Sequence, residues 1–434
     1  MDVKRYPVPT PGTLPTGASA RVTVPGSKSI TNRALLLAAL SQGTSTLHGC
    51  LSSADAQVFL ECLCTLGFAV TRDGDDITVT GCGGRIPRDA GEIYVGSAGT
   101  AARFLTAMLA FSRGEYTVCS SPQMQRRPMA PLIAALRAAG AEVECLGEEG
   151  HFPLRIRGAA PEQIPDALTV NIDESSQFLS ALLIAAGTLP RPLQIRVTGS
   201  HGLAYVEMTA AMMAQFGVTP AFREGTYHLP GADGYLSREY IVEPDLSAAA
   251  YFYAMAALTG AQVTVERVSA QMLQGDAAFL DVLEQMGCRV LRGAEVTVIG
   301  SADGRLRGGF TVDMSAFSDQ ALTLAAIAPY ADAPIRIIGI GHIRLQECNR
   351  IQAIVKNLAA LGVPVTETAD GVQISPAVPR PCEIETFEDH RVAMAFALTG
   401  LRTPGVVIRN PDCCKKTFAE YFTVLENTLS QLSE

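Results

Sequence analysis

Several features that would place a protein in a common class are missing from this 434-residue sequence. No uncharged apolar run reaches the roughly 18–20 residues that a membrane-spanning helix needs. The opening stretch, MDVKRYPVPTPGTLPTG, lacks the apolar core of a secretory signal peptide. An excess of basic charge is also missing, because the formal net charge is −9. We therefore expect neither a membrane nor a nucleic acid as the main partner.

The sequence also lacks a cysteine framework. Its eleven cysteines are odd in number and scattered, and no CxxC pair occurs. Neither the Cys62/Cys64 pair nor the Cys413/Cys414 pair has histidines at ligand spacing, so we expect no metal site. Reduced thiols in a cytoplasmic protein fit this pattern better than a set of disulfides.

Motifs of three common enzyme classes are missing as well. The Gly26–Ser29 stretch, GSKS, has no glycine directly before its lysine and no earlier glycine at P-loop spacing. Neither a GxSxG elbow nor an HExxH helix occurs. A nucleotide-binding P-loop, a serine hydrolase elbow and a zinc protease site are therefore all disfavoured.

What the sequence does contain is a repeat. Stretches rich in small apolar residues recur at intervals of 70 to 76 residues, counted from Ser29, Gly99, Ser175, Asp245, Asp319 and Asp389. Each stretch opens with a polar or charged segment and continues with apolar residues on all sides. A helix that is apolar all round belongs in the interior of a protein. The repeat therefore predicts six interior helices spread over nearly the whole chain.

A second, amphipathic helix is predicted within each period. In five periods this helix stops at a glycine, which can adopt a left-handed cap without steric cost; these are Gly67, Gly140, Gly217, Gly287 and Gly362. Two short β-like runs separated by a turn follow each stop. Each unit therefore reads strand, interior helix, strand, amphipathic helix and two strands. Six such units predict an α/β protein with helices inside and sheets outside.

The openings of the interior helices are candidate anion sites. Backbone N–H groups at a helix start have no partner within the helix, and the helix dipole adds a partial positive charge. Serine or aspartate there usually only caps the helix. Capping does not require Lys28, Arg33 or Arg391, however, so the cations indicate a site for phosphate or carboxylate groups. For His390, a core role and a site role remain equally supported.

Seven motifs together resemble one known family. PGSKSITNR, GSAGTAARF, QRRPM, SSQFLSALL, SDQALTLAA, EDHRVAM and KKTF occur in this order between Pro25 and Phe418. They resemble the motifs of the 3-phosphoshikimate 1-carboxyvinyltransferase, or EPSP synthase, family. The related UDP-N-acetylglucosamine enolpyruvyl transferases share the six-unit architecture, but their opening motif differs.

The resemblance implies a fold, a reaction and partners. The fold would be a two-domain inside-out α/β barrel, the enolpyruvyl transferase fold, with three units in each domain. One domain would comprise residues 25–242 and the other residues 1–24 and 243–434, with the active site in the cleft between them. The 5-hydroxyl of shikimate 3-phosphate would attack C2 of phosphoenolpyruvate, C3 would gain a proton, and phosphate would leave. This is the step toward chorismate and aromatic amino acids, and the resemblance implies no metal or organic cofactor. We also expect a monomer.

Carried over position by position, the resemblance assigns three sets of residues. Shikimate 3-phosphate would be held by Lys28, Ser29, Arg33, Ser175, Ser176, Gln177, Asp319 and Gln346. Phosphoenolpyruvate would be held by Lys28, Gly99, Arg127, Gln177, Arg350, Arg391 and Lys416. The catalytic set would be Lys28, Asp319, Glu347 and His390. Within it, Asp319 would accept the hydroxyl proton, and Glu347 with Lys28 would serve proton transfer at C3.

Two departures from the family pattern stand out. Gln346 occupies a position where the family usually has a lysine, and Gly202 one where it usually has a serine. An amide in place of an ammonium removes a charge-assisted hydrogen bond, worth roughly 1.5–3 kcal/mol. We expect weaker binding of shikimate 3-phosphate in an active enzyme. Enolpyruvyl transfer to another acceptor such as a UDP-sugar, and a non-catalytic anion-binding relative, remain as alternatives.

Overall fold

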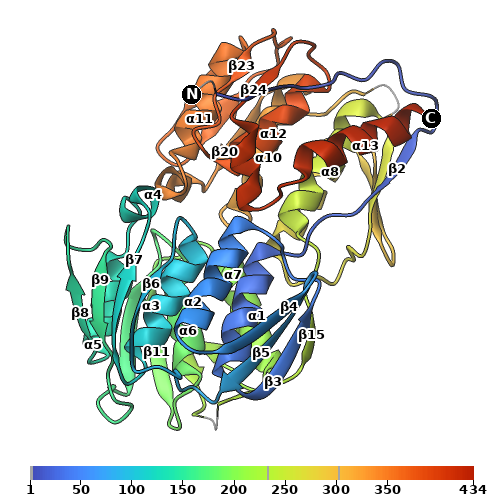
Figure 1. The fold of residues 1–434 in the computed structure, drawn as a ribbon. Coiled ribbons are helices and arrows are strands. Elements are labelled where there is room, and N and C mark those ends of the chain that lie inside the picture. Colours follow the sequence, from blue (N-terminus) through green and yellow to red (C-terminus); the bar gives the residue numbers. More distant parts are fainter. Residues whose placement is uncertain (1–2, 232–233, 302–303) are drawn as a thin grey trace. The chain divides into compact units, whose positions relative to one another are not determined.

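The computed structural model describes residues 3–231, 234–301 and 304–434. They fold into two compact units, one formed by Gly26–Val242 and the other by Met1–Pro25 together with Glu243–Glu434 (Figure 1). We call them the 26–242 unit and the 243–434 unit. None of the helices in the described ranges is long and apolar enough to cross a membrane.

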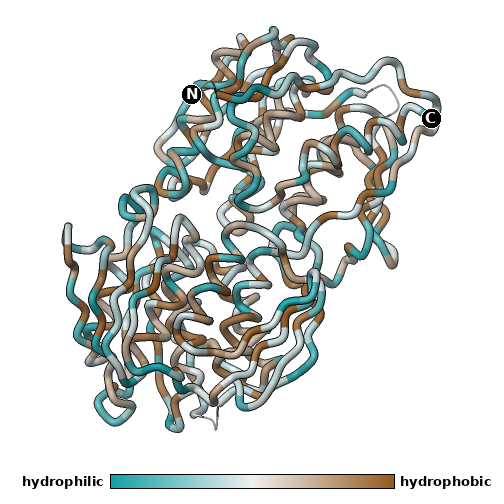
Figure 2. Tube along the Cα trace, viewed as in Figure 1, coloured by the Kyte–Doolittle hydropathy of each residue, from teal (hydrophilic) through white to brown (hydrophobic). Residues whose placement is uncertain are grey.

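The 26–242 unit is built around three interior helices. They are α1 (Lys28–Leu40), α3 (Gly99–Ala110) and α6 (Gln177–Ala186), and α3 packs against both of the others. All twelve residues of α3 are buried, as its apolar sequence predicts. The hydropathy colouring shows these helices largely brown or pale within their unit (Figure 2). Around them lie α2 (Ala54–Thr65), α4 (Pro122–Gln125), α5 (Ala130–Ala138) and α7 (Leu203–Gln215).

Three sheets complete this unit, each containing an antiparallel hairpin. One has the order β14-β3-β5-β4, with β15 also on β3, from Tyr235–Leu236, Ser41–His48, Asp76–Cys82, Ala69–Asp73 and Glu239–Ile241. The next is β6-β7-β9-β8, from Ala90–Tyr94, Glu115–Cys119, Leu154–Arg157 and Glu142–Cys145. The third is β10-β11-β13-β12, from Ala167–Asn171, Leu193–Thr198, Thr226–Leu229 and Ala221–Arg223.

The 243–434 unit has the same kind of interior. Helices α8 (Leu246–Thr259), α10 (Ala321–Ile327) and α12 (His390–Gly400) pack against one another. Outside them lie α9 (Phe279–Gln285), α11 (Arg350–Ala360) and α13 (Tyr421–Ser433). Short 3-10 turns precede or follow several of these helices: η1 (Gly275–Ala278), η2 (Ser318–Gln320), η3 (Ala328–Tyr330), η4 (Gly341–Leu345) and η5 (Pro411–Lys416).

Its sheets take strands from both ends of the chain. One is β17-β18-β16-β2, from Arg289–Arg292, Val296–Ile299, Gln262–Val265 and Ser19–Val22. Another is β19-β20-β22-β21, from Phe310–Asp313, Ile335–Ile338, Val372–Ile374 and Val365–Glu367. The last is β1-β24-β23, from Arg5–Pro7, Val407–Arg409 and Glu383–Ile384. Strands β1 and β2, from the N-terminal part of the chain, thus belong to the sheets of this unit.

Two pairs of parallel strands join segments that are far apart in the sequence, because the strands that precede α1 and α8 are exchanged. Most interior helices connect two neighbouring parallel strands, as α3 connects β6 and β7. The strand before α1, β2, instead pairs with β16, the strand after α8. In return, β15, before α8, pairs with β3, after α1. The chain therefore leaves one unit and re-enters it later, and the backbone N–H of Asp245 donates to Pro25 O at 2.8 Å where the two connecting segments meet.

The predicted helix stops are confirmed. The five glycines at the ends of α2, α5, α7, α9 and α11 all have positive φ, between +77° at Gly362 and +99° at Gly287. At these angles an L side chain would be strained, so the glycines end the helices where the sequence indicates. The mixed α/β class predicted from the repeat is confirmed as well.

Candidate active site

Arg33 is a buried cation in the 26–242 unit. Its guanidinium donates to Thr209 Oγ1 at 2.7 Å, Ser29 O at 2.9 Å and Tyr205 O at 3.2 Å. No carboxylate of the described residues pairs with it, and burial lowers its pKa to about 10. It remains protonated at neutral pH, and a buried charge without a counter-ion favours binding of an anion.

Lys28 opens the same helix and does have an acidic neighbour. Its Nζ lies 3.5 Å from Asp55 Oδ2, and the two side chains are 16% and 8% exposed. Ser27, the residue before the first turn of α1, makes no side-chain cap to the helix. The N–H groups at the start of α1 therefore lie beside an ammonium, an arrangement that favours an anion.

At the start of α3, Gly99 makes room for two guanidinium groups. A Cβ built on Gly99 would lie 2.5 Å from Arg127 Nη1 and 2.6 Å from Arg103 Nη1. Arg103 is fully buried and donates to Gly99 O at 3.2 Å, Pro128 O at 3.1 Å and Gln177 Oε1 at 3.2 Å. It thereby joins three predicted positions, Gly99, Gln177 and the segment that carries Arg127. Arg103 lies within GTAARF but is not among the predicted site residues.

Contact with Ser176, the residue before α6, explains why position 202 is a glycine and not the serine usual in the family. Gly202 has φ +64°, and a Cβ there would lie 2.6 Å from Ser176 Oγ. A serine at position 202 is therefore disfavoured by both backbone and space in this chain. Ser175 Oγ accepts from the backbone N–H of Gln177 at 3.3 Å, so Ser175 and Ser176 stand together at the helix opening.

In the 243–434 unit the predicted residues gather around Arg350, which is 1% exposed. Its Nε donates to Asp389 Oδ2 at 2.7 Å, its Nη1 to Asp319 Oδ1 at 3.0 Å and its Nη2 to Glu347 Oε2 at 2.9 Å. Burial acts to lower the pKa of Arg350, but these carboxylates outweigh burial and raise it above its ordinary value. The side chain is a permanent cation with three anionic partners.

Two more cations share the same carboxylates. Arg391 Nη2 donates to Asp319 Oδ2 at 2.8 Å, and Lys416 Nζ donates to Glu347 Oε1 at 3.3 Å. Asp319 thus lies between two guanidinium groups, and Glu347 between a guanidinium and an ammonium. The structure brings together Asp319, Glu347, Arg350, Arg391 and Lys416, which come from four separate segments of the sequence.

Gln346 also belongs to this cluster. Its Oε1 accepts a hydrogen bond from Arg350 Nη1. A lysine at this position could not accept this bond and would instead place an ammonium beside the guanidinium. The exchange of lysine for glutamine therefore changes how the buried arginine is held, as well as the local charge.

Asp389 and His390 begin α12 together. Asp389 is 0% exposed, accepts from Arg391 N at 2.9 Å as the helix cap, and also accepts from Arg350. The bond to Arg350 could not be predicted from the sequence, where Asp389 is only the opening of a helix. The His390 ring is 1% exposed, with Nδ1 3.7 Å from Asp389 Oδ1. The predicted catalytic role of His390 stays a prediction.

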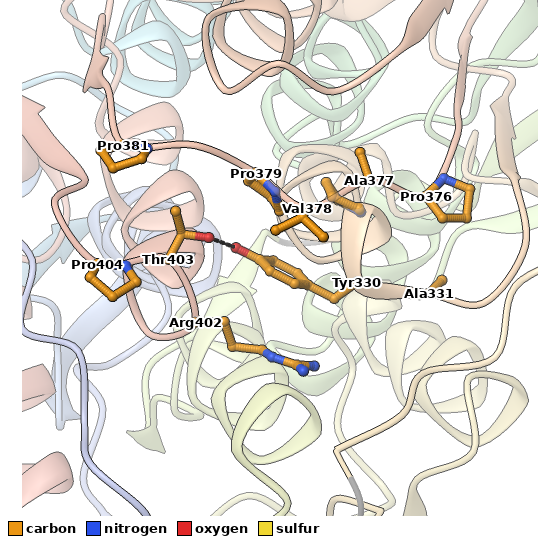
Figure 3. A pocket seen from close by; sticks show the side chains of 11 residues that line it. Tyr330, Ala331, Pro376, Ala377, Val378, Pro379, Pro381, Arg402, Thr403 and Pro404 are labelled. Atoms are coloured by element: carbon orange, nitrogen blue, oxygen red, sulfur yellow. Dashed lines mark hydrogen bonds between the residues drawn. The ribbon is translucent and has the colours of Figure 1, made fainter.

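Neither a metal cluster nor a nearby hollow adds to this site among the described residues. No group of three or more His, Cys, Asp or Glu side chains that could hold a metal ion occurs in the part of the chain that the structure describes. A hollow of about 780 Å³ in the 243–434 unit is lined by prolines, Val378, Arg402 and Tyr330, whose hydroxyl contacts Thr403 Oγ1 (Figure 3). None of the predicted site residues lines it.

Comparison with known proteins gives one consistent answer. Residues 14–425 match the family model described as EPSP synthase (3-phosphoshikimate 1-carboxyvinyltransferase). A 3-phosphoshikimate 1-carboxyvinyltransferase of Trichormus variabilis is 45% identical over 410 residues, which cover 93% of this chain and 95% of the relative. One from Ralstonia pickettii is 40% identical, with 94% and 96% covered.

A solved structure agrees with the sequence comparison. The EPSP synthase structure from Acinetobacter baumannii superposes with a TM-score of 0.79 at 25% identity and covers 98% of both chains. The match extends over both units, so the fold and the motifs point the same way. This chain belongs to the EPSP synthase family.

Proposed function

We propose that this chain is an enzyme that transfers the enolpyruvyl group of phosphoenolpyruvate to the 5-hydroxyl of shikimate 3-phosphate and releases phosphate. The observation that carries the proposal is the cluster around Arg350, where three cations and three carboxylates from separate motifs meet. Cations suit the phosphate and carboxylate of the donor, and carboxylates suit the proton transfers. Family membership supports the same reaction.

In this proposal the 26–242 unit holds shikimate 3-phosphate. Arg33 supplies a buried positive charge, and Ser29, Ser175 and Ser176 supply hydroxyl groups at helix openings. Lys28, Gln177, Asp319 and Gln346 complete the predicted set. Hydroxyl and guanidinium donors together match the oxygens of a phosphate monoester.

Phosphoenolpyruvate is assigned to Lys28, Gly99, Arg127, Gln177, Arg350, Arg391 and Lys416. Its phosphate and carboxylate compete with Asp319 and Glu347 for the same donors. As the ligand takes over these donors, Asp319 loses two charge-assisted bonds and becomes a stronger base. Asp319 then accepts the proton of the attacking hydroxyl, while Glu347 and Lys28 serve protonation at C3. His390, whose Nδ1 lies 3.7 Å from Asp389 Oδ1, is assigned to the catalytic set.

The domain arrangement is part of the proposal. The two units act as two domains of three strand–helix units each, in an inside-out α/β barrel, and each contributes groups to one active site in the cleft. The reaction requires no metal or organic cofactor. We place the protein in the cytoplasm as a monomer acting on small anions and not on nucleic acid, and its eleven free thiols support a reducing compartment.

The test is phosphate release by the purified full chain with both substrates, with each substrate omitted in turn. We expect turnover that requires both, and a fall in kcat of about 10²–10⁴ for Asp319→Asn. Asp281→Asn is the matched control, because Asp281 forms a surface pair with Arg292. Phosphate release with a UDP-sugar and none with shikimate 3-phosphate would reassign the acceptor. Folded protein without turnover on either would contradict the proposal.

A further inference from the structure

A buried carboxyl outside the family motifs contacts the residue next to Asp319. Asp276 lies in η1, directly before α9, and is 5% exposed. This stretch begins the amphipathic helix that stops at Gly287, and Asp276 is not among the predicted site residues. A buried carboxyl costs stability unless it is hydrogen-bonded, so its partners show how it is accommodated.

Asp276 uses one oxygen for two donors. Its Oδ1 accepts from Gln320 Nε2 at 2.7 Å and from Ser247 Oγ, in the first turn of α8, at 2.8 Å. Gln320 is itself 0% exposed, and its Oε1 accepts from Thr323 Oγ1 at 3.1 Å. The Gln320 amide is therefore held at both ends.

Gln320 and Asp319 belong to the same three-residue turn, η2. Fixing the Gln320 side chain fixes the backbone of this turn, which sets the direction from which the Asp319 carboxylate meets Arg350 and Arg391. Asp276 is thus connected to Asp319 by one hydrogen bond, the Gln320 side chain and one peptide bond. A shift of the Gln320 amide would turn the Asp319 carboxylate relative to its two arginines.

The electrostatic environment connects the two carboxyls as well. The pKa of Asp276 is raised to about 6: burial contributes most and the Asp319 carboxylate adds to it, while Arg391 on α12 and the hydrogen bonds from Gln320 and Ser247 act in the opposite direction. Asp319 and Arg391 are the charged groups that act on it, and α8 presents the neutral Ser247. Repulsion between two carboxylates is reciprocal, so an ionised Asp276 increases the proton affinity of Asp319.

We propose that Asp276 is a positioning residue for Asp319, which it orients through Gln320 and, when ionised, makes a stronger proton acceptor. The inference rests on the proposed function, since it requires Asp319 to accept the substrate proton. Asp276 itself touches no substrate in this scheme. Its effect should therefore be seen in kcat and in its pH dependence rather than in substrate affinity.

The test is the pH profile of phosphate release by the full chain between about pH 5 and 9. In the wild type, kcat should rise as Asp276 ionises near pH 6. Asp276→Asn keeps an oxygen for Gln320 and Ser247 but cannot ionise. We expect kcat of this variant at pH 8 to be about tenfold lower than in the wild type, the effect of one pKa unit in the proposed base, Asp319. Both KM values should stay within about twofold of the wild type, and the rise in kcat near pH 6 should be lost.

A second variant and a control separate this role from simple structural support. Ser247→Ala removes a bond that favours the ionised form, so the rise in kcat should move to higher pH. Glu243→Gln is the control. This half-buried carboxyl accepts from Leu273 N and Gln274 Nε2, in the segment just before Asp276, and the pH profile of the variant should match that of the wild type.

The outcomes distinguish two failures. A wild-type chain without turnover would contradict the proposed function. Turnover in the wild type, with wild-type pH profiles for both Asp276→Asn and Ser247→Ala, would overturn only the role of Asp276. If Asp276→Asn does not fold, the Ser247→Ala profile decides, and an unmoved rise near pH 6 refutes the inference.

Discussion

Asp389 offers a sharp test of how the buried cation cluster is held. Its carboxylate has two tasks, since it caps α12 through Arg391 N and pairs with Arg350 through bonds of 2.7 and 3.3 Å. Asp389→Ala removes both. We expect a larger loss of stability than a missing helix cap produces, because a buried guanidinium loses its most fully buried partner.

The magnitude follows from the two tasks. A lost aspartate cap costs about 1 kcal/mol. Breaking a buried ion pair costs about 3–5 kcal/mol, and the lower end applies because Arg350 keeps Asp319 and Glu347. The unfolding free energy of Asp389→Ala should therefore fall by about 4 kcal/mol.

The chain supplies a matched control in Asp245. It caps α8, another interior helix of the same unit, by accepting from Ser247 N at 2.8 Å and Ala248 N at 3.3 Å. None of the described cations forms an ion pair with it, so Asp245→Ala should cost only about 1 kcal/mol. The difference between the two variants isolates the Arg350 pair.

Equilibrium urea unfolding followed by circular dichroism measures both variants against the wild type. A difference of about 3 kcal/mol between them supports the ion-pair assignment. Equal losses would refute it, because Asp389 would then act only as a cap. Asp389→Asn should fall between the two, since an amide oxygen still caps the helix but carries no charge.

Three further predictions concern the other buried groups. Gly99→Ala should raise KM for phosphoenolpyruvate about tenfold in steady-state assays, since its Cβ would displace the guanidinium groups of Arg127 and Arg103; an unchanged KM would contradict the site at α3. Arg33→Gln should weaken shikimate 3-phosphate binding about 10- to 100-fold by calorimetry, as loss of a charge-assisted bond implies, and equal affinity would exclude Arg33 from the site. Folding raises the pKa of Asp276, so its contribution to stability is lost as pH rises from about 4 to 6. The unfolding free energy of Asp276→Asn relative to the wild type, measured by urea unfolding, should therefore rise by about 2 kcal/mol between pH 4.5 and 7. If this difference did not change with pH, the raised pKa of Asp276 would be refuted.

The interior helices and their ends could be predicted because both depend on local sequence. A helix such as α8, with apolar residues on every side, has no solvent-facing surface to offer. The glycine stops are similarly local, since one residue must adopt positive φ at the helix end. Neither feature requires knowledge of what the helix packs against.

The strand exchange could not be predicted in the same way. β2 pairs with β16 across more than 200 residues of sequence, and alternation within a strand does not identify its partner. The contacts of Asp389 with Arg350 and of Asp276 with Gln320 also join residues distant in the sequence, so they could not be predicted. An aspartate at the start of a helix is already explained by capping alone. Only the folded chain shows that Arg350 and Gln320 lie beside these two aspartates.

The two units hold their buried arginines in different ways, and this difference bears on the order of events. Among the described residues Arg33 has neutral hydrogen-bond partners, so its charge is available to the phosphate that we propose binds there. Arg350 and Arg391 are already bound to Asp319, so an anion must displace that carboxylate to reach them. In the proposed mechanism this displacement would free the Asp319 carboxylate from two charge-assisted hydrogen bonds, so that it could accept a proton once the donor is in place. If the proposed assignments hold, the ion pairs that neutralise the cluster would also prevent Asp319 and Glu347 from acting before phosphoenolpyruvate binds.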